Sequence, residues 1–277
     1  SPMSVALPPI AERRGSLLGD ALVVARRSLL HMRRQPEALA DVTIQPVMFV
    51  LLFAFVFGGA IDVAGGGYRE FLMGGVFAQS IVFSAFGVAL GLAHDRTNGA
   101  IDRFRSLPMA RGAVLAGYAL ANLVRALLPI ALMSLCGLVV GWRIRTSVLE
   151  ALGGFALMIL FSFAIIWVGV LLGSLLPSPE AVQGVAFVAL FPLTFVASTF
   201  VPVETLPGVL RTIAEWNPVT AFAEALRTLF GNPGVELAGG IPWSLEHATA
   251  YTLLWAAGIV LVCAPLAIRA YQRTTSD

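Results

Sequence analysis

The sequence predicts an all-α membrane protein that crosses the bilayer six times. Three observations support this: hydrophobic residues make up 58% of the 277 residues, charged residues make up only 12%, and apolar residues gather into runs of about 20, the length that a helix needs to cross the hydrocarbon core. Soluble domains contain about 25% charged residues. Half of that proportion cannot cover a soluble surface of this size, so a soluble globular fold is excluded.

Six stretches meet the length criterion for a transmembrane helix. They are Val42–Ala60, Phe71–Ala93, Val114–Gly141, Ala151–Leu176, Ala181–Val203 and Ala248–Ile268. We therefore expect a transmembrane domain over 42–268, flanked by an N-terminal segment (1–41) and a C-terminal tail (269–277). An even number of spans places both flanks on the same side of the membrane.

The distribution of Arg predicts which side that is, because basic residues concentrate in cytoplasmic segments. Both flanks and the loop 94–112 together carry 12 of the 18 Arg, whereas the opposite side carries five. The two flanks and this loop are thus predicted to be cytoplasmic. A composition rich in Ala, Gly and Arg and free of Lys is typical of GC-rich bacterial genes, so we expect a bacterial inner membrane.

Ahead of the first span, Ser16–Gln35 repeats apolar residues at near-heptad spacing, with Arg pairs on the remaining arc. This pattern is typical of an amphipathic helix that lies in the lipid headgroup plane. The alternative is a solvated basic helix. On the opposite side, the segment 204–247 holds two short apolar stripes interrupted by Pro, which predicts amphipathic helices at the outer leaflet before the last span.

In that outer segment Asn217 and Pro218 are expected to begin the second short helix, because Asn is a strong N-cap and Pro fits the first helical position. Glu224 and Arg227 then stand three residues apart on one face of the helix, close enough to pair. Two patterns of small residues, Gly87–Gly91 and Gly169–Gly173, predict close helix approach. Packing within the chain is the expected use, and packing between chains is the alternative.

Several chemistries are disfavoured by what the predicted spans lack. They contain no carboxylate and no His, which argues against an ion-coupled carrier and against a metal or catalytic site. Without Lys the chain has no P-loop to cradle ATP phosphates. Its near-neutral charge balance gives no surface for nucleic acid. Arg125 is the one charged residue inside a span, and either its side chain snorkels to the headgroups or it faces inward toward a carboxylate or an anionic substrate group.

Two motifs resemble those of the membrane subunits of type-2 ABC exporters, specifically the daunorubicin-resistance-like permeases. One is the cytoplasmic loop Asp95–Met109, with a charged segment, a Gly, an acid and a late Leu-Pro. The other is Trp216–Pro218 followed by Glu224 and Arg227. Thr97 departs from the family, many of whose members carry Glu at that position, so we expect no ionic contact there in this chain.

The resemblance implies a permease that pairs with a second copy and two separate ABC ATPase subunits, which hold ATP and Mg²⁺, and that exports a hydrophobic or amphipathic drug, lipid or secondary metabolite. No catalytic residue, metal or cofactor is expected in this chain. The ATPase coupling residues would be Asp95, Arg96, Gly99, Asp102, Arg103, Phe104, Arg105 and Pro108, and the candidates for the transport path or exit are Arg125, Asn217, Pro218, Glu224 and Arg227. The alternatives are a polytopic membrane enzyme acting on lipids and an ion-coupled carrier.

Overall fold

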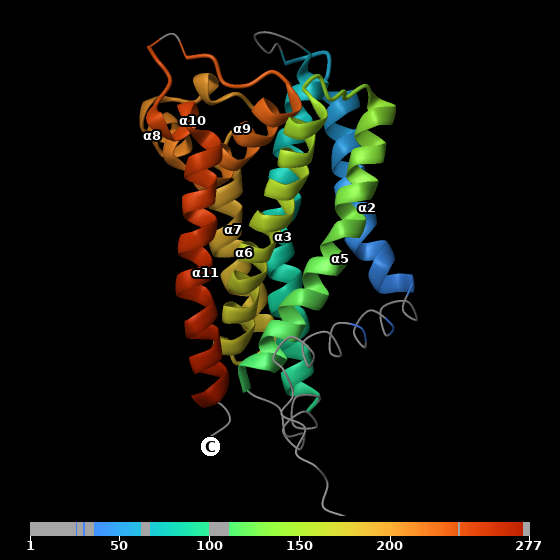
Figure 1. The fold of residues 1–277 in the computed structure, drawn as a ribbon, viewed down its shortest axis with the longest axis vertical. Helices are drawn as coiled ribbons and strands as arrows, with labels where there is room; N and C mark the ends of the chain where they lie inside the picture. The colour runs from blue at the N-terminus through green and yellow to red at the C-terminus, as the bar shows by residue number, and fades with distance from the viewer. Residues whose placement is uncertain are drawn as a thin grey trace, which may run out of the picture.

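The computed structural model describes residues 26, 30, 36–61, 67–99, 111–237 and 239–273. These residues form helices joined by turns and short irregular segments, and none of them lies in a β-strand. Figure 1 shows them as one upright helical bundle. The predicted all-α class is confirmed. The predicted interfacial helix lies outside the described residues, apart from Arg26 and Leu30.

The long helices of the described chain run the height of the bundle. They are α2 (Pro36–Val56), α3 (Tyr68–Thr97), α5 (Arg111–Val140), α6 (Val148–Leu175), α7 (Pro179–Phe195) and α11 (Ala248–Arg273). Four of them, α3, α5, α6 and α11, are long and apolar enough to cross a membrane, whereas α7 and the apolar part of α2 (Ile44–Val56) are shorter. Length and composition thus support four spans, and the count of six stays a prediction.

The predicted fifth span does not continue to Val203 as one helix, because α7 ends at Phe195. Residues 196–202 are non-helical and lead into a 3-10 turn. The Asn217 side chain explains this early end. Its amide donates to the carbonyls of Leu193 and Val196, at 2.7 Å in each case, and so replaces bonds that a continuing helix would supply.

Three short helices, α8 (Gly208–Trp216), α9 (Pro218–Phe230) and α10 (Trp243–Glu246), gather at the upper end of the bundle in Figure 1. As predicted, Asn217 caps α9: its Oδ1 accepts from the Val219 amide at 2.8 Å, and Pro218 is the first helical residue. The helix ends at Gly231, whose φ of 69° favours glycine.

The expectation that this second helix rests on the outer leaflet is wrong, because α9 lies inside the protein. Ten of its 13 residues are buried, including Glu224 and Arg227, and it packs against α3, α6 and α11. Only Thr228 of this helix is exposed, so α9 presents almost no surface to lipid. By contrast, α8 leaves Val209, Ile213 and Trp216 exposed.

The core is organised by α3, which packs against α2, α5, α6, α7 and α9. Its closest approach is to α6, where a Cβ added at Gly169 or Gly173 would meet the backbone oxygen of Ala85 or Ala89 at 2.5 and 2.7 Å. The prediction of close packing is therefore confirmed for this pair of glycines. It is wrong for Gly87, since a Cβ there would meet no described atom within 4 Å.

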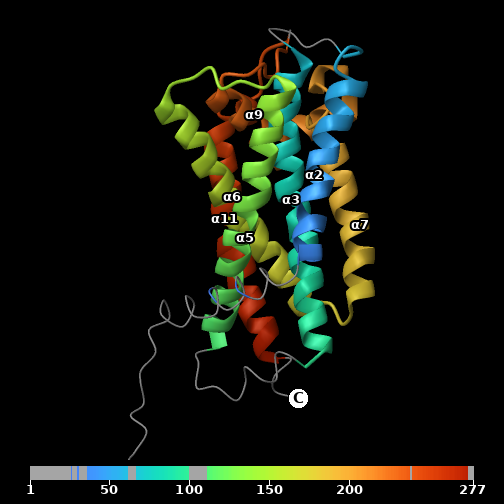
Figure 2. The ribbon, with the colours of Figure 1, turned by 90° about the vertical axis from the view of Figure 1, so that its right-hand side faces the viewer.

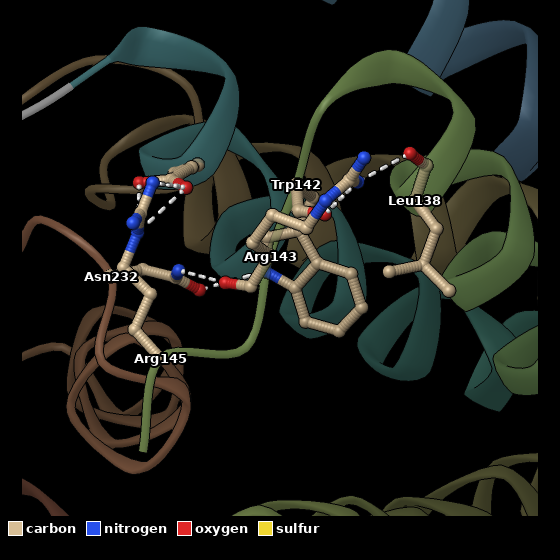
Figure 3. A network of polar contacts seen from close by, with 6 residues as sticks. Leu138, Trp142, Arg143, Arg145 and Asn232 are labelled. Atoms are coloured by element: carbon tan, nitrogen blue, oxygen red, sulfur yellow. Dashed lines mark hydrogen bonds and ion pairs between the residues drawn. The ribbon is translucent and has the colours of Figure 1, made fainter.

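A polar network ties α9 to the α5–α6 loop at the upper end of the bundle (Figure 3). The indole Nε1 of Trp142 donates to Asn232 Oδ1 at 2.7 Å, and Asn232 Nδ2 donates to the Arg143 carbonyl at 2.8 Å. Arg145 forms an ion pair with Glu70 at the start of α3, with an Nη2–Oε1 distance of 2.8 Å. These contacts join three separate parts of the chain.

The α3–α6 contact predicts that a methyl group added at Gly173 destabilises the protein. Gly258, which lies outside this contact, provides the control. Gly173→Ala should lower the free energy of unfolding by about 1–3 kcal/mol, because the added methyl group meets the α3 backbone. Gly258→Ala in α11 meets open space and should leave stability unchanged or raise it by about 0.5–1 kcal/mol. Thermal unfolding in detergent measures both, and equal melting temperatures would contradict the packing described.

Candidate functional site

A cavity of about 630 Å³ lies among the helices α2, α3, α5, α6 and α7, within the range of small-molecule sites. In Figure 2, α2 and α5 face the viewer and α7 lies beside α2. The wall is predominantly apolar, and Phe side chains form much of it. The aromatic lining residues are Phe49, Phe83, Phe86, Phe191, Phe195 and Phe200.

The α3 wall of this cavity includes a stripe of small and polar residues at helical spacing, next to apolar residues such as Phe83 and Phe86. Ser80, Ser84, Gly87, Gly91 and His94 follow one another at intervals of four, three, four and three residues, so they share one face of the helix. Small side chains leave room beside the α3 backbone. This explains why Gly87 faces open space rather than another helix.

The α5 wall contributes Asn122 and Arg125. Arg125 lies 14 residues after the first residue of α5 and 15 before its last, which places it about 21 Å along a helix about 45 Å long. Arg125 is half-buried and lies far from both ends of this helix. Its position in the cavity wall supports the inward-facing alternative over snorkelling.

Two buried polar side chains in the cavity wall have unsatisfied atoms. Gln79 is 7% exposed and Ser162 is 1% exposed. Neither Gln79 Oε1 nor Ser162 Oγ has a hydrogen-bond partner in the described part of the structure. Leaving a buried polar group without a partner costs about 1–3 kcal/mol, so these atoms are available to a polar group that enters the cavity.

Arg227 belongs to a second polar cluster, which does not line the cavity. Its side chain is fully buried: Nε donates to the Phe71 carbonyl at 2.9 Å, and Nη2 donates to the Ser198 carbonyl at 2.7 Å. The guanidinium also lies 3.6 Å from the centre of the Phe71 ring. Glu224 Oε2 is 3.5 Å from its Nη1, so the predicted pairing is confirmed.

The electrostatics of this cluster keep Arg227 charged. Burial lowers the pKa of the guanidinium to about 10, and the Glu224 carboxylate opposes that shift. At neutral pH the side chain therefore remains a cation that can donate hydrogen bonds to backbone carbonyls. Glu224 in turn accepts from the Val235 amide through Oε1 at 2.9 Å, which fixes the segment that follows α9.

The cluster holds the non-helical segment 196–202 inside the bundle. Irregular backbone is tolerated at membrane depth only where the protein satisfies its polar groups. Arg227 serves the Ser198 carbonyl, the Thr220 hydroxyl accepts from the Ser198 amide at 3.0 Å, and Tyr68 donates to the Phe200 carbonyl at 2.8 Å. Since Phe200 lines the cavity, the cluster positions part of the cavity wall.

The predicted coupling loop is described only at its start. Gly99, with φ of 65°, ends α3, and Asp95 lies in the last turn of that helix. Arg96 is turned toward α6: its Nη1 donates to the carbonyls of Gly173, Ser174 and Leu176 at 2.8–3.1 Å. It therefore caps the end of α6. The other predicted coupling residues, Asp102, Arg103, Phe104, Arg105 and Pro108, lie outside the described residues.

Sequence reasoning missed the functional arrangement of three features. The spacing of the small and polar residues on α3 could be recognised in the sequence, but the glycines among them were interpreted as packing residues. The burial of α9 had no decisive signal in the sequence, although its small residues Ala221, Ala223 and Ala225 leave room for neighbouring helices. The capping role of Arg96 had no local signal, because the carbonyls that it serves lie nearly 80 residues away.

The chain is similar to known proteins over most of its length. The family described as ABC-2 type transporter matches residues 20–230. The chain belongs to this family. The daunorubicin resistance ABC transporter permease protein DrrB1 of Streptomyces coeruleorubidus is 32% identical over 94% of this chain and 88% of its own length. The predicted resemblance is thereby confirmed.

Two further relatives of this ABC-2 permease come from Mycobacterium tuberculosis. The "Probable doxorubicin resistance ABC transporter permease protein DrrC" is 26% identical over 94% of this chain and 90% of its own length. The doxorubicin resistance ABC transporter permease protein DrrB is 24% identical over 92% of this chain and 89% of its own length.

No group of His, Cys, Asp and Glu residues that could hold a metal ion occurs among the residues described for the present chain.

The Arg227 cluster of this ABC-2 permease predicts a large loss of stability for Arg227→Gln. The shorter neutral side chain leaves backbone carbonyls and the Glu224 carboxylate without their cation, which should cost about 3–5 kcal/mol. Arg211→Gln is the matched substitution, because Arg211 forms a partly exposed i,i+4 pair with Glu215 at 2.9 Å, and the loss of this pair should cost about 0.5 kcal/mol.

A thiol-reactive dye reports both variants, since Cys136 and Cys263 are free and partly buried. Their labelling during heating gives the melting temperature. Arg227→Gln should melt well below the wild type, and Arg211→Gln should melt close to it. Similar melting temperatures for the two variants would show that the buried guanidinium does not hold the structure together.

Proposed function

We propose that this chain is the transmembrane permease subunit of an ATP-driven ABC exporter for hydrophobic or amphipathic molecules. The cavity carries the proposal: it lies among the long apolar helices of an ABC-2 family member and combines an aromatic wall with a few polar groups. The names of the relatives, which are permeases for resistance to daunorubicin or doxorubicin, support a drug, lipid or secondary metabolite as cargo.

In this proposal the chain crosses the inner membrane six times, with α2 and α7 as the two shorter spans and both flanks in the cytoplasm. The permease domain is 42–268, the N-terminal flank 1–41 rests partly on the membrane, and 269–277 is a tail. The outer segment 204–247 covers the upper end of the bundle. Asn217, Pro218, Glu224 and Arg227 support that end by fixing the backbone, rather than by contacting cargo.

Energy would come from a separate ABC ATPase, present in two copies and carrying ATP and Mg²⁺. The chain itself has no Lys with which to build a P-loop. Two permease copies would form the membrane part. ATP-driven closure of the ATPase pair would act on the loop 94–112 and rock the permeases between two arrangements, as domain movements about an interface do.

The export proposal is tested with inside-out vesicles that contain the permease and its ABC ATPase. On addition of ATP the vesicles should accumulate doxorubicin or the neutral fluorescent amphiphile 1-pyrenebutanol. Gly87→Leu should reduce accumulation about tenfold or more, because the new side chain fills space beside the α3 wall of the cavity. Gly258→Leu, which also adds a side chain in open space but outside the cavity, should transport like the wild type.

Vesicles whose ATPase lacks its Walker-A Lys provide the background. Failure of both probes to accumulate above this background would overturn the export proposal. Equal transport by the Gly87 and Gly258 variants would remove the cavity from the pathway and leave ATP-driven export standing.

The coupling assignment is tested separately by replacing Arg103, Phe104 and Arg105 together with Ala. If these residues dock onto the ATPase, the triple variant should no longer co-purify with it, while keeping the melting temperature of the wild type. A variant with Ala at Arg269 and Arg273 removes positive charge elsewhere on the proposed cytoplasmic side and should retain the ATPase. An intact complex with the triple variant would show that the loop is only a connection between helices.

A further inference from the structure

Two side chains in the cavity wall carry polar atoms that the fold leaves without a partner. They are Gln79 on α3 and Ser162 on α6, which are 7% and 1% exposed, respectively. Neither Gln79 Oε1 nor Ser162 Oγ forms a hydrogen bond within the part of the chain that the structure describes. Buried polar groups in folded proteins are nearly always hydrogen-bonded, so both atoms require an explanation.

The Ser162 hydroxyl differs from other hydroxyls in the long helices. A Ser or Thr side chain within a helix can donate to a backbone carbonyl of the preceding turn. Ser134, Ser174 and Thr194 each do so, at 2.7–2.8 Å. Ser162 makes no such bond. Its hydroxyl therefore remains able to donate to, or accept from, a group that occupies the cavity.

Gln79 and Ser162 lie at the same height in the bundle. A close contact brings Gly169 of α6 against Ala85 of α3, and a second one lies four residues further along both helices, so the two helices run in the same direction. Ser162 lies seven residues, or about two turns, before Gly169. The α3 residue two turns before Ala85 is Ala78, the neighbour of Gln79. A small polar group at this height would thus lie next to both side chains.

We propose that Gln79 and Ser162 form a subsite that recognises a hydroxyl group on an otherwise apolar ligand. A hydroxyl group both donates and accepts hydrogen bonds. It can donate to Gln79 Oε1, which only accepts, and accept from the Ser162 hydroxyl. The inference rests on the proposed export function in treating a ligand of the cavity as cargo, and it narrows that cargo to molecules that carry a hydroxyl group.

The surroundings of the subsite define the body of the ligand. A Cβ added at Gly75, one turn before Gln79 on α3, would meet the Thr199 backbone, so the segment that carries Phe200 passes about one turn from the subsite. Phe200 stacks on Phe49 with ring centres 6.0 Å apart, and both rings line the cavity. Flat aromatic faces pack well against a planar ring system. The subsite therefore suits a hydroxyl group attached to planar apolar rings.

The selectivity of the subsite comes from what an unsuitable ligand leaves unpaired. A site with buried polar groups rejects an analogue that lacks the matching hydroxyl, because those groups then have no partner. A wholly apolar ligand would exclude water from Gln79 and Ser162 and offer them nothing in return. An ether can accept from Ser162 but has no hydrogen to donate to Gln79 Oε1, so it should bind with intermediate affinity.

The test uses three probes that share a pyrene body and differ in one short substituent: 1-pyrenemethanol, 1-(methoxymethyl)pyrene and 1-ethylpyrene. Binding to the full chain in phosphatidylcholine nanodiscs is followed by energy transfer from Trp to pyrene, and each affinity is expressed relative to partition into empty nanodiscs. The wild type should then bind the alcohol about tenfold more tightly than the ethyl compound, with the ether between them. Equal binding of the alcohol and the ethyl compound would overturn the proposal.

Variants assign the preference to the two side chains. Ser162→Ala and Gln79→Met each remove one partner of the hydroxyl group and should reduce the tenfold preference to about threefold or less. Ser174→Ala is the matched control, because Ser174 is also buried on α6 but lies outside the cavity lining and its hydroxyl already donates to the Val170 carbonyl. It should keep the wild-type preference. Equal loss in the two Ser variants, or no loss in Ser162→Ala and Gln79→Met, would overturn the assignment.

The melting temperature separates a binding role from a structural one. Replacing a polar group that has no partner by an apolar group of similar shape is nearly neutral or stabilising. Gln79→Met and Ser162→Ala should therefore melt at or above the temperature of the wild type when no ligand is present. A large decrease for both variants would show that these side chains hold the fold together and would overturn the subsite.

ATP-driven accumulation of the same probes in inside-out vesicles separates this inference from the export proposal. Preferential binding of the alcohol without any ATP-dependent accumulation would leave the subsite standing and overturn export. Equal binding of the three probes, together with ATP-dependent accumulation of all of them, would leave export standing and overturn the subsite. Preferential accumulation of the alcohol that is lost in Ser162→Ala and kept in Ser174→Ala would support both.

Discussion

The structure depends on one constraint, that backbone groups inside the membrane must be satisfied by the protein itself. Where α7 ends, the chain turns through 196–202 without helical hydrogen bonds, and the bundle supplies replacements from α9 and α3. Arg227 contributes most, because its planar fork reaches carbonyls on two separate segments. The position of Phe200, and with it the wall of the cavity, follows from a cation that never contacts the cavity.

Interactions between residues close in sequence made part of this arrangement predictable. The Asn217 cap and the pairing of Glu224 with Arg227 depend on residues close in sequence, and both were found where they were expected. The burial of α9 was not predictable in the same way. An amphipathic helix can face lipid or protein with the same sequence pattern, and only the surrounding helices decide. Gly74 and Gly75, which give α9 and the 196–202 segment room on α3, become meaningful only with those neighbours.

The two patterns of small residues show the same ambiguity. Gly169 and Gly173 let two backbones touch, whereas Gly87 borders open space. A glycine in the sequence indicates only that no side chain is present at that position. Whether another helix or a cavity lies next to the glycine depends on the tertiary structure. This is why the glycines of the α3 wall were interpreted as packing residues. Arg125 was recognisable as an exception among apolar residues, but its place at the cavity required the relative positions of α3 and α5.

The contact between α3 and α6 bears on how such a protein can move. Backbone meets backbone at Gly169 and Gly173, and Arg96 joins the end of one helix to the end of the other. Two helices in such close contact cannot slide past each other without a clash, so α3 and α6 are expected to move as one rigid unit. Any change in cavity width must then come from α2, α5 and α7. A force applied at the lower end of α3 would then tilt α3 and α6 together and move the short helices at the upper end of the bundle.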